Sequence, residues 1–413
     1  MPESKFKSSL ARDGGPQVKS TPFGTGNRYD DVELEQLQET LQQQTLFCVD
    51  GQKVQSLCQK VAKKLGISYA TAVSSGTGAV HTALAAAGVR PGDHVVTSPI
   101  SDAGTIIGIL FQGAIPLFSD LDSYTYAFDL DSLANTITDR TRVVMPVHLG
   151  GTPGPMDQIM EIARERSCRV IEDCAQAWGA TYKGNSVGTM GDLGAFSFNE
   201  NKQISCGDGG IVITDSKKLA RGTRLFSDKY YDRESNTIIS PAHIGANYRM
   251  TELQAAVALA QLEKLDWITR KRRHQGSRLT EELMDIPGIK PMMEPSGSHS
   301  SYWFYLFRID SKALGIDSQI FADTVSAEGV PAVRGYIKEC IYQWDMLSKK
   351  QVFPGTDWPL AGTKDYYTGM CPEAEAILDT SVRLVVNEFH TDQDVEDQIA
   401  AVRKVALHYY KKP

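Results

Sequence analysis

Short apolar runs alternate with amphipathic stretches through the first two thirds of the chain. The apolar runs are three to five residues long, and the stretches between them place apolar residues on one helical face. Short buried strands that alternate with helices predict an α/β fold with a mostly parallel sheet of about seven strands. The expected strands are 69–73, 94–97, 115–118, 143–147, 169–171, 195–198 and 210–214, and the expected helices include one from about Leu34, 54–65, 77–87 and 156–164.

The last third of the chain has a different pattern, which predicts a second and smaller domain. The stretch from Thr251 to about Arg273 is amphipathic and contains no Gly or Pro, so we expect a long helix that leads out of the large domain. A dense aromatic strand candidate, 302–307, follows it, and helical patterns appear at 318–328 and 392–409. The expected division is a flexible N-terminal arm at 1–30, a large domain at 31–275 and a small C-terminal α+β domain at 276–413.

Composition and charge narrow the range of environments and partners. The chain has 413 residues, of which 41% are hydrophobic and 23% charged, as in ordinary soluble globular proteins. A net charge of −7 argues against a nucleic-acid partner. No apolar run has the length of a membrane span, and the polar N-terminal segment lacks the pattern of a secretory signal. The seven cysteines form no Cys-x-x-Cys pair, which argues against a metal site and favours a reducing cytoplasm.

A turn rich in hydroxyl groups and glycine links the first expected strand to its helix. Backbone amides and hydroxyls at a helix N-terminus favour the binding of a phosphate. The same residues also suit a helix N-cap without a ligand, so this pattern alone leaves both interpretations open. It is not a dinucleotide-binding fingerprint, because His81 stands where the third glycine would be. The residues of the turn are Ser74, Ser75, Gly76, Thr77 and Gly78.

Two charged residues follow expected strands and together indicate a cofactor. Asp173 comes after the strand 169–171, at the edge where open α/β sheets bind ligands. Lys202 comes after the strand 195–198 and before a glycine cluster at 207–210. A lysine that holds an aldehyde as an imine, facing a carboxylate that pairs with a pyridine nitrogen, is what pyridoxal phosphate (PLP) chemistry requires. A helix N-cap is the commoner role of an Asp that follows a strand, and most lysines are surface charges. Lys202, however, is preceded by an apolar strand.

Two neighbouring side chains extend this hypothesis. Gln176, three residues after Asp173, is placed either to reach the phenolic oxygen of the cofactor or to complete a capping interaction. Ser197 alternates with Phe196 and Phe198 along its strand, so its hydroxyl is expected on the phosphate side. A Lys202 amine released from the cofactor would serve as a general base.

These residues belong to a longer series of motifs that resembles a known family, the DegT/DnrJ/StrS-type sugar aminotransferases of PLP fold type I. The resemblance is dense from about 51 to 261 and weaker towards the C-terminus. Each motif alone is unspecific, but together, in this order and spacing, they are highly specific. The motifs are Ser75-Gly76-Thr77, Arg90-Pro91-Gly92-Asp93, Val147-His148-Leu149-Gly150-Gly151, Glu172-Asp173-Cys174-Ala175-Gln176, Gly188-Thr189-Met190-Gly191-Asp192, Ser197 through Lys202, Gly207-Asp208-Gly209-Gly210 and Asn247-Tyr248-Arg249-Met250.

The resemblance implies a fold and a set of cofactor contacts. The large domain would be like that of aspartate aminotransferase, with pyridoxal 5'-phosphate bound to Lys202 as a Schiff base. Asp173 would pair with the pyridine nitrogen and Gln176 with the phenolic oxygen. No metal is expected. The remaining implied cofactor-binding residues are Ser75, Gly76, Thr77, the backbone of Gly78, Asp102, His148, Ser197 and Asn247.

The resemblance also implies partners and a reaction class. In the family, the asparagine at the position of Asn247 reaches the phosphate of the neighbouring subunit, which implies a homodimer with shared active sites. Members transfer an amino group from glutamate or glutamine to a keto group of a nucleotide-linked sugar or a cyclitol. Amino-sugar or antibiotic biosynthesis is therefore the expected context.

Three departures from the family leave the acceptor open. Asp102 stands where members usually carry an aromatic residue that stacks on the cofactor ring. Glu200 lies in a segment that usually reads His-Pro-Thr, and 334–338 replaces a His-Tyr segment. One alternative is another PLP reaction such as dehydration or epimerisation, but family dehydratases have His in place of Lys202. A non-catalytic relative is the other alternative, and the presence of Lys202, Asp173 and Gln176 together disfavours it.

Overall fold

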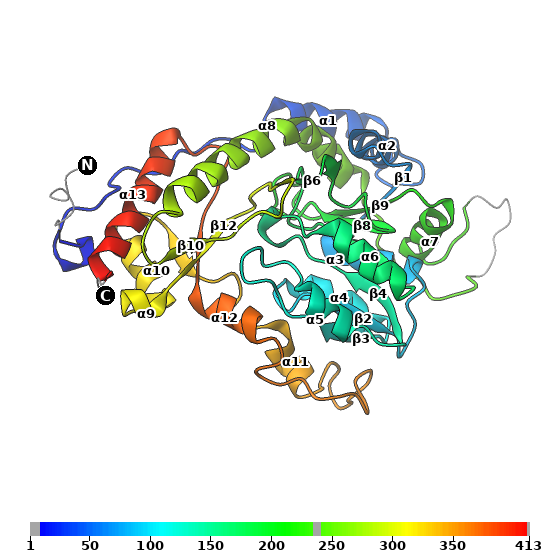
Figure 1. Ribbon diagram of the computed structural model, residues 1–413. Helices are drawn as coiled ribbons and strands as arrows, with labels where there is room; N and C mark the ends of the chain where they lie inside the picture. Colours follow the sequence, from blue (N-terminus) through cyan, green and yellow to red (C-terminus); the bar gives the residue numbers. More distant parts are fainter. Residues whose placement is uncertain (1–8, 234–240, 411–413) are drawn as a thin grey trace.

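A seven-stranded sheet forms the centre of the larger part of the molecule (Figure 1), and the computed structural model describes residues 9–233 and 241–410. Its strands are β1 (Tyr69–Val73), β2 (His94–Thr97), β3 (Ile115–Phe118), β4 (Thr141–Met145), β5 (Arg169–Asp173), β8 (Leu193–Ser197) and β9 (Gly210–Thr214). They lie in the order β1-β9-β8-β5-β4-β2-β3. Strands β8, β5, β4, β2 and β3 are parallel, whereas β9 is antiparallel to both β8 and β1. The expected mostly parallel sheet is confirmed.

Helices cover both faces of this sheet, because alternate residues of its strands enter two different apolar clusters. In β9, Val212 belongs to one cluster and its neighbours Ile211 and Ile213 belong to the other. The first cluster also contains Val80 and Ile106 from helices on that face. The helices of the large domain are α1 (Asp31–Gln42), α2 (Lys53–Leu65), α3 (Gly76–Ala86), α4 (Ala103–Phe111), α5 (Leu130–Thr136), α6 (Met156–Glu165) and α7 (Lys217–Ser227).

Helix α8 (Glu252–Leu283) runs from the large sheet to the small domain (Figure 1). A capping box formed by Thr251 and Gln254 fixes its start. The expected end near Arg273 is wrong, because the helix continues through Gly276 to Leu283, nearly three turns further, and crosses the expected domain boundary. A side chain at Gly276 would lie 2.4 Å from the ring of Tyr302, so close packing explains a glycine there. Across the described residues, no helix is long and apolar enough to cross a bilayer.

The small domain is built on an antiparallel sheet of four strands in the order β10-β12-β14-β13. The expected aromatic strand begins only at Tyr305, because the amides of Ser301 and Trp303 donate to the carbonyls of Gly151 and Gly150 instead of to a sheet neighbour. The strands are β10 (Ile289–Pro291), β12 (Tyr305–Ile309), β13 (Ala332–Arg334) and β14 (Ser381–Leu384), with helices α9 (Ser311–Leu314), α10 (Ser318–Ala327), α11 (Asp345–Ser348), α12 (Pro372–Thr380) and α13 (Asp392–Tyr409). A separate three-stranded sheet contains β6 (Thr181–Tyr182), β7 (Asn185–Ser186) and β11 (Ser298–His299).

The described part of the expected flexible arm is packed against the small domain. Leu10 is fully buried in the apolar core of that domain. The Lys19 ammonium lies 2.6 Å from the Asp394 carboxylate, and both side chains are buried. Asp30 then caps α1. From residue 9 onward the arm is therefore not loose, since buried contacts and an ion pair hold it, while residues 1–8 lie outside the described residues.

Candidate active site

A cavity of about 330 Å³ lies where β5 and β8 end and α3 and α4 begin. This is the edge at which open α/β sheets bind their ligands. Its size falls within the range of small-molecule sites. The structure therefore brings most of the predicted site residues together: Ser75, Gly76, Thr77, Asp102, Asp173, Gln176, Ser197 and Lys202 all line this cavity.

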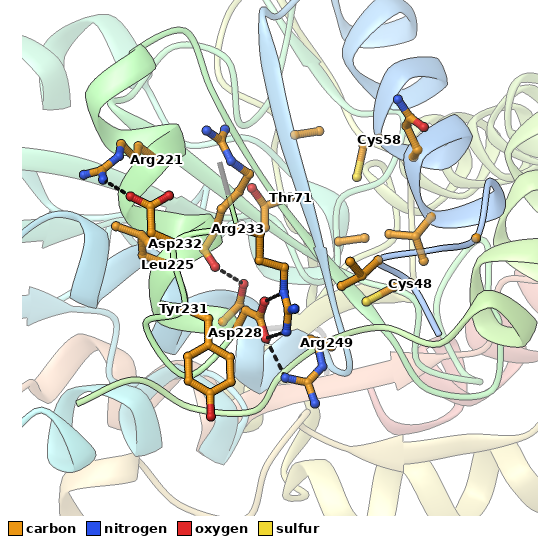
Figure 2. Close-up of a pocket in the computed structure, with 18 residues that line it drawn as sticks. Cys48, Cys58, Thr71, Arg221, Leu225, Asp228, Tyr231, Asp232, Arg233 and Arg249 are labelled. Carbon is orange, nitrogen blue, oxygen red and sulfur yellow. Dashed lines mark hydrogen bonds and ion pairs between the residues drawn. The ribbon is translucent and has the colours of Figure 1, made fainter. Parts of the chain in front are cut away.

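A larger cavity, of about 570 Å³, lies beside α7 and does not contain Lys202 (Figure 2). Some of its charged groups pair with one another: the guanidinium groups of Arg233 and Arg249 lie 2.5 and 2.6 Å from the Asp228 carboxylate. Asn247, the predicted phosphate ligand of a neighbouring subunit, pairs through its backbone with Asp228 and is exposed. It is far enough from the smaller cavity to be absent from its lining.

Lys202 lies in the turn after β8, with only 8% of its surface exposed. Burial lowers the pKa of its amine to about 8, although the charges of Asp102 and Asp173 act in the opposite direction. A lowered pKa increases the fraction of unprotonated amine near neutral pH, which is the form that a nucleophile or a general base requires. The interpretation of Lys202 as a surface charge is therefore wrong.

Asp173 is the last residue of β5 and is 3% exposed. No helix follows it directly, so the interpretation as a helix N-cap is wrong. Its carboxylate accepts hydrogen bonds from the Thr105 hydroxyl at 2.7 Å and from the Ala175 amide at 3.1 Å. Burial raises the pKa of Asp173 despite these bonds. Such a carboxylate gains from a cationic partner in the cavity, which fits a protonated pyridine nitrogen.

The start of α3 forms a helix cap and also lines the cavity, so it is compatible with both roles that the sequence left open. The Ser75 hydroxyl caps the helix by accepting from the Gly78 amide at 3.0 Å, and Ser75 also lines the cavity. A side chain at Gly76 would lie 2.6 Å from the Cβ of Ser197, so only glycine permits this close approach of the backbone. The cradle of small residues and first-turn amides suits a phosphate. Gly78 itself is outside the cavity lining, and the Ser75 hydroxyl occupies its amide.

The side chains of Gln176 and Ser197 are held by neighbouring groups. Gln176 accepts from the Gly150 amide at 2.7 Å and donates to the Tyr336 hydroxyl at 3.3 Å, so it does not cap a helix. Ser197 accepts from the Asn199 amide at 3.1 Å and faces the cavity. Its neighbours Phe196 and Phe198 pack on Trp178 on the opposite side of the strand, as the alternation predicts.

The two departures near the cavity have different surroundings. Asp102 caps α4 by accepting from the Gly104 amide at 2.9 Å, and it also lines the cavity. The Glu200 carboxylate turns towards the N-terminal arm and accepts from the Tyr29 hydroxyl at 2.6 Å and the Ser205 hydroxyl at 3.2 Å. Glu200 is therefore part of the contact between the arm and the lysine turn.

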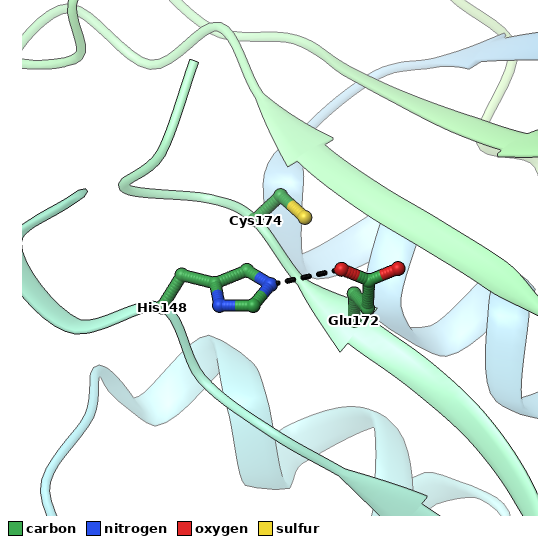
Figure 3. Close-up of side chains that lie close together, drawn as sticks. All are labelled: His148, Glu172 and Cys174. Carbon is green, nitrogen blue, oxygen red and sulfur yellow. Dashed lines mark hydrogen bonds and ion pairs between the residues drawn. The ribbon is translucent and has the colours of Figure 1, made fainter. Parts of the chain in front are cut away.

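His148, expected to bind the cofactor, belongs to a buried cluster with Glu172 and Cys174 (Figure 3). Its Nε2 lies 3.0 Å from the Glu172 carboxylate, and its Nδ1 accepts from the Gly154 amide at 3.2 Å. The proton of the ring is therefore on Nε2. His148, expected to bind the cofactor, is absent from the cavity lining, and both of its ring nitrogens are engaged by these bonds.

The same cluster does not favour a metal ion. The Glu172 carboxylate already accepts from the amides of Gly188, Met190 and Gly191 as well as from His148. Burial raises the pKa of the Cys174 thiol well above its ordinary value, so the thiolate that a metal would require is strongly disfavoured. These bonds instead explain the Gly188-Thr189-Met190-Gly191 motif as a backbone turn closed around Glu172.

Four groups near the cavity were given no role in the sequence analysis. Thr105 lies three residues after Asp102 and binds Asp173. Trp303 and Tyr336 come from the small-domain part of the chain, and the Trp303 ring lies 3.5 Å from the Lys202 amine. Asp208 also lines the cavity; the sequence analysis quoted its glycine-rich segment without giving it a role.

Comparison with known proteins places the chain in a family. Residues 27–403 match the DegT/DnrJ/EryC1/StrS aminotransferase family. The chain belongs to this family. Its members are PLP-dependent aminotransferases, and this chain is an enzyme of that class.

Two relatives and one solved structure are similar to this chain over most or about half of its length. A putative L-glutamine:3-amino-2,3-dideoxy-scyllo-inosose aminotransferase from Micromonospora echinospora is 31% identical over 78% of this chain and 78% of its own length. A GDP-perosamine synthase from Escherichia coli O157:H7 is 41% identical over 54% of this chain and 61% of its own length. The aminotransferase from Psychrobacter cryohalolentis has 28% identity and a TM-score of 0.84, with 94% of this chain and 100% of that chain covered. The family thus includes aminotransferases named for sugars and for cyclitols.

Proposed function

We propose that this enzyme transfers an amino group from glutamate or glutamine to a keto group of a nucleotide-linked sugar or a cyclitol, with PLP bound in the 330 Å³ cavity. The observation that carries the proposal is the buried Lys202 amine, whose lowered pKa places it near neutrality in the same cavity as the buried Asp173 carboxylate. The names of the two relatives support both acceptor types and, for one of them, glutamine as the donor.

The residues present fit the cofactor at each of its functional groups. Bound there, PLP supplies an electron sink for the carbon that carries the amine. Asp173 is buried and lacks a full set of donors, which suits the pyridine nitrogen. The Gln176 amide already donates to a phenolic oxygen, that of Tyr336, and would do so to the cofactor. Lys202 would hold the aldehyde carbon, and Ser75, Thr77 and Ser197 with the first amides of α3 would hold the phosphate.

The protein residues then act on protons and charge. The Lys202 amine, once free, would act as the general base that accepts and returns a proton, and a pKa near 8 suits transfer in both directions. Asp173 would stabilise a positive charge on the ring nitrogen of the bound cofactor, because its carboxylate has no other cation bonded to it among the described residues. Burial of both groups strengthens their interaction.

The main test replaces the lysine. Lys202→Ala should reduce transamination by about 10⁴-fold or more, because both the covalent anchor and the base are lost. The variant should still bind PLP, noncovalently. Borohydride treatment followed by mass spectrometry should give a cofactor adduct on Lys202 of the wild type and none on the variant. Lys60→Ala, at an exposed position of α2, is the matched control and should keep full turnover.

Two results would count against the proposal. Full turnover of Lys202→Ala would remove the lysine from the mechanism. A dehydrated product formed from a keto-sugar without any amino donor would favour the alternative PLP reaction.

We also propose a homodimer in which Asn247 completes the site of the neighbouring subunit. Its exposure supports this role, as does its absence from the cavity lining within one chain. Mixing inactive Lys202→Ala and Asn247→Ala homodimers should restore part of the activity, because mixed dimers contain one site with both residues intact. No recovery after demonstrated subunit exchange would contradict the shared site.

A further inference from the structure

The indole ring of Trp303 covers the amine of Lys202. The Nζ atom lies 3.5 Å from the centre of the ring. This is well inside the distance of about 6 Å at which an ammonium group is attracted to an aromatic face. The contact is long-range in the chain, since Trp303 follows the end of α8 and Lys202 follows β8.

Three contacts fix the orientation of this ring. The Trp303 amide donates to the Gly150 carbonyl at 2.8 Å. Its indole N–H donates to the carbonyl of Asn201, the residue before Lys202. The ring of Tyr336 packs edge-on against it, with 5.7 Å between the ring centres. Trp303 is therefore attached both to the loop after β4 and to the lysine turn itself.

This placement answers a departure that the sequence left open. The cavity lining contains no aromatic side chain among the described residues, and Asp102 occupies the position after β2 where the family usually has one. The aromatic surface next to the lysine is instead contributed from the small-domain side of the site. The Trp303 ring contacts the Lys202 amine directly, so the residue that it affects is the lysine.

The charged and titratable groups around the amine come from several elements. Asp102 at the start of α4, Asp173 at the end of β5 and Asp208 in the glycine-rich turn line the same cavity. The Tyr336 hydroxyl accepts from Gln176, and burial raises its pKa, so it stays neutral. Burial disfavours the ammonium form of Lys202, whereas the ring face and the carboxylates favour it.

We propose that Trp303 is a positioning residue for Lys202: its ring holds the amine at the cavity and stabilises positive charge on Nζ, while its N–H fixes the turn that carries the lysine. This role deepens the proposed transamination, because the same amine must move a proton there. A purely structural role of Trp303 would leave the protonation of Lys202 unchanged. The positioning role predicts that this protonation changes when the ring is removed.

The test measures the pKa of Lys202 in the full-length apoenzyme. Trace labelling with acetic anhydride at a series of pH values, quantified by mass spectrometry, reports the protonation of each lysine. Trp303→Leu should lower the pKa of Lys202 by about 0.5–1 unit, because the ring face that stabilises the ammonium is lost. Trp303→Phe retains a ring face and should lower it by less. Trp267→Leu, on the outer part of α8, is the matched control and should leave it unchanged.

Activity of the holoenzyme gives a second readout. Trp303→Leu should lower kcat while the KM for the amino donor changes by no more than about twofold, because the ring acts on the lysine and not on the donor. The acid limb of the kcat profile should move to lower pH together with the pKa of Lys202. If this pKa is unchanged in Trp303→Leu, the proposal is wrong.

A subtler change keeps the test valid if Trp303→Leu does not fold. Ring-fluorinated tryptophan weakens the negative face of the indole and keeps its shape and N–H. Incorporated into the wild type it should lower the pKa of Lys202, and incorporated into Trp303→Phe it should not. Equal shifts of the Lys202 pKa in the wild type and in Trp303→Phe would overturn the proposal. The acetic anhydride labelling uses no substrate, so it tests the role of Trp303 independently of transamination. A failure to transaminate any acceptor would count against the proposed function and not against this role of Trp303.

Discussion

Two adjacent carboxylates on β5 have opposite surroundings, and the difference separates a structural group from a functional one. Glu172 and Asp173 point to opposite faces of the strand, as neighbours in a strand must. Both are almost fully buried. Glu172 accepts four hydrogen bonds, from the ring of His148 and three backbone amides, whereas Asp173 accepts two, from Thr105 and Ala175.

The comparison shows that burial alone does not identify a site. A carboxylate with a complete set of donors has no capacity left for a ligand, and its removal disturbs the fold. A buried carboxylate with an incomplete set is costly to ionise, and the pKa of Asp173 is accordingly raised. The ionised form of such a group is stabilised when a cation enters the cavity. A cationic ligand therefore supplies the partner that the protein itself does not provide.

The largest expected effect is on the cavity side. Asp173→Asn should lower turnover by about 10²–10³-fold, the usual loss when one electrostatic partner of the reacting group is removed. The folded apoenzyme should not lose stability, because the substitution removes a buried charge and keeps the shape. Steady-state kinetics and thermal unfolding of the same preparation check both parts. If Asp173→Asn lost stability together with activity, Asp173 would be a structural group like Glu172.

The pH dependence of that stability follows from the direction of the pKa. Since the pKa of Asp173 is raised above its ordinary 3.8 in the folded state, its ionisation costs stability as the pH rises through the folded-state pKa. Below 3.8 both states are protonated and the cost vanishes. The Tm of apo Asp173→Asn should therefore exceed that of the wild-type apoenzyme near pH 7, and the gain should shrink as the pH falls.

The next effect is on the opposite face of the strand. Glu172→Gln should destabilise the folded state by about 3 kcal/mol, because the NH2 group that replaces one carboxylate oxygen cannot accept from the donors that now face it. Urea unfolding with an unchanged m-value would measure this loss. Turnover per folded molecule should remain within a few-fold of wild type. A large loss of turnover at full stability would show that Glu172 also acts in catalysis.

The smallest expected effect comes from the hydroxyl group that donates to Asp173 in the cavity. Thr105→Val removes the hydroxyl that donates to Asp173 and keeps the volume of the side chain. Turnover should fall by about tenfold, since one hydrogen bond to a charged group is lost. The pH at which Asp173 titrates should rise, because ionisation of the carboxylate loses a donor. Unchanged kinetics would mean that the cofactor alone sets the ionisation of Asp173.

Local patterns predicted the groups that stand next to regular strands and helices. Asp173 and Lys202 follow apolar strands, so their positions at one edge of the sheet could be derived from the alternation of strands and helices. Ser197 could be assigned to the cavity side because side chains alternate along a strand. The hydroxyl-rich turn at the start of α3 was predictable for the same local reason.

Groups brought together across long separations could not be predicted in this way. The ring of Trp303 reaches Lys202 only because the segment before β12 binds the loop after β4. The length of α8 was underestimated, since the packing of Tyr302 against Gly276 carries the helix past the expected end. The arm reaches Glu200 through Tyr29, a contact between residues 171 positions apart.

The sequence by itself determined the sheet, the placement of Lys202 and Asp173 at its edge, and the cradle at the start of α3, because each depends on periodicity within a single strand or helix. Only the tertiary structure decided which carboxylate of β5 faces the cavity with donors missing, where the ring of His148 points, and which aromatic ring covers the lysine. These outcomes depend on which distant segments supply the hydrogen-bond donors and ring faces, and no local pattern encodes that choice.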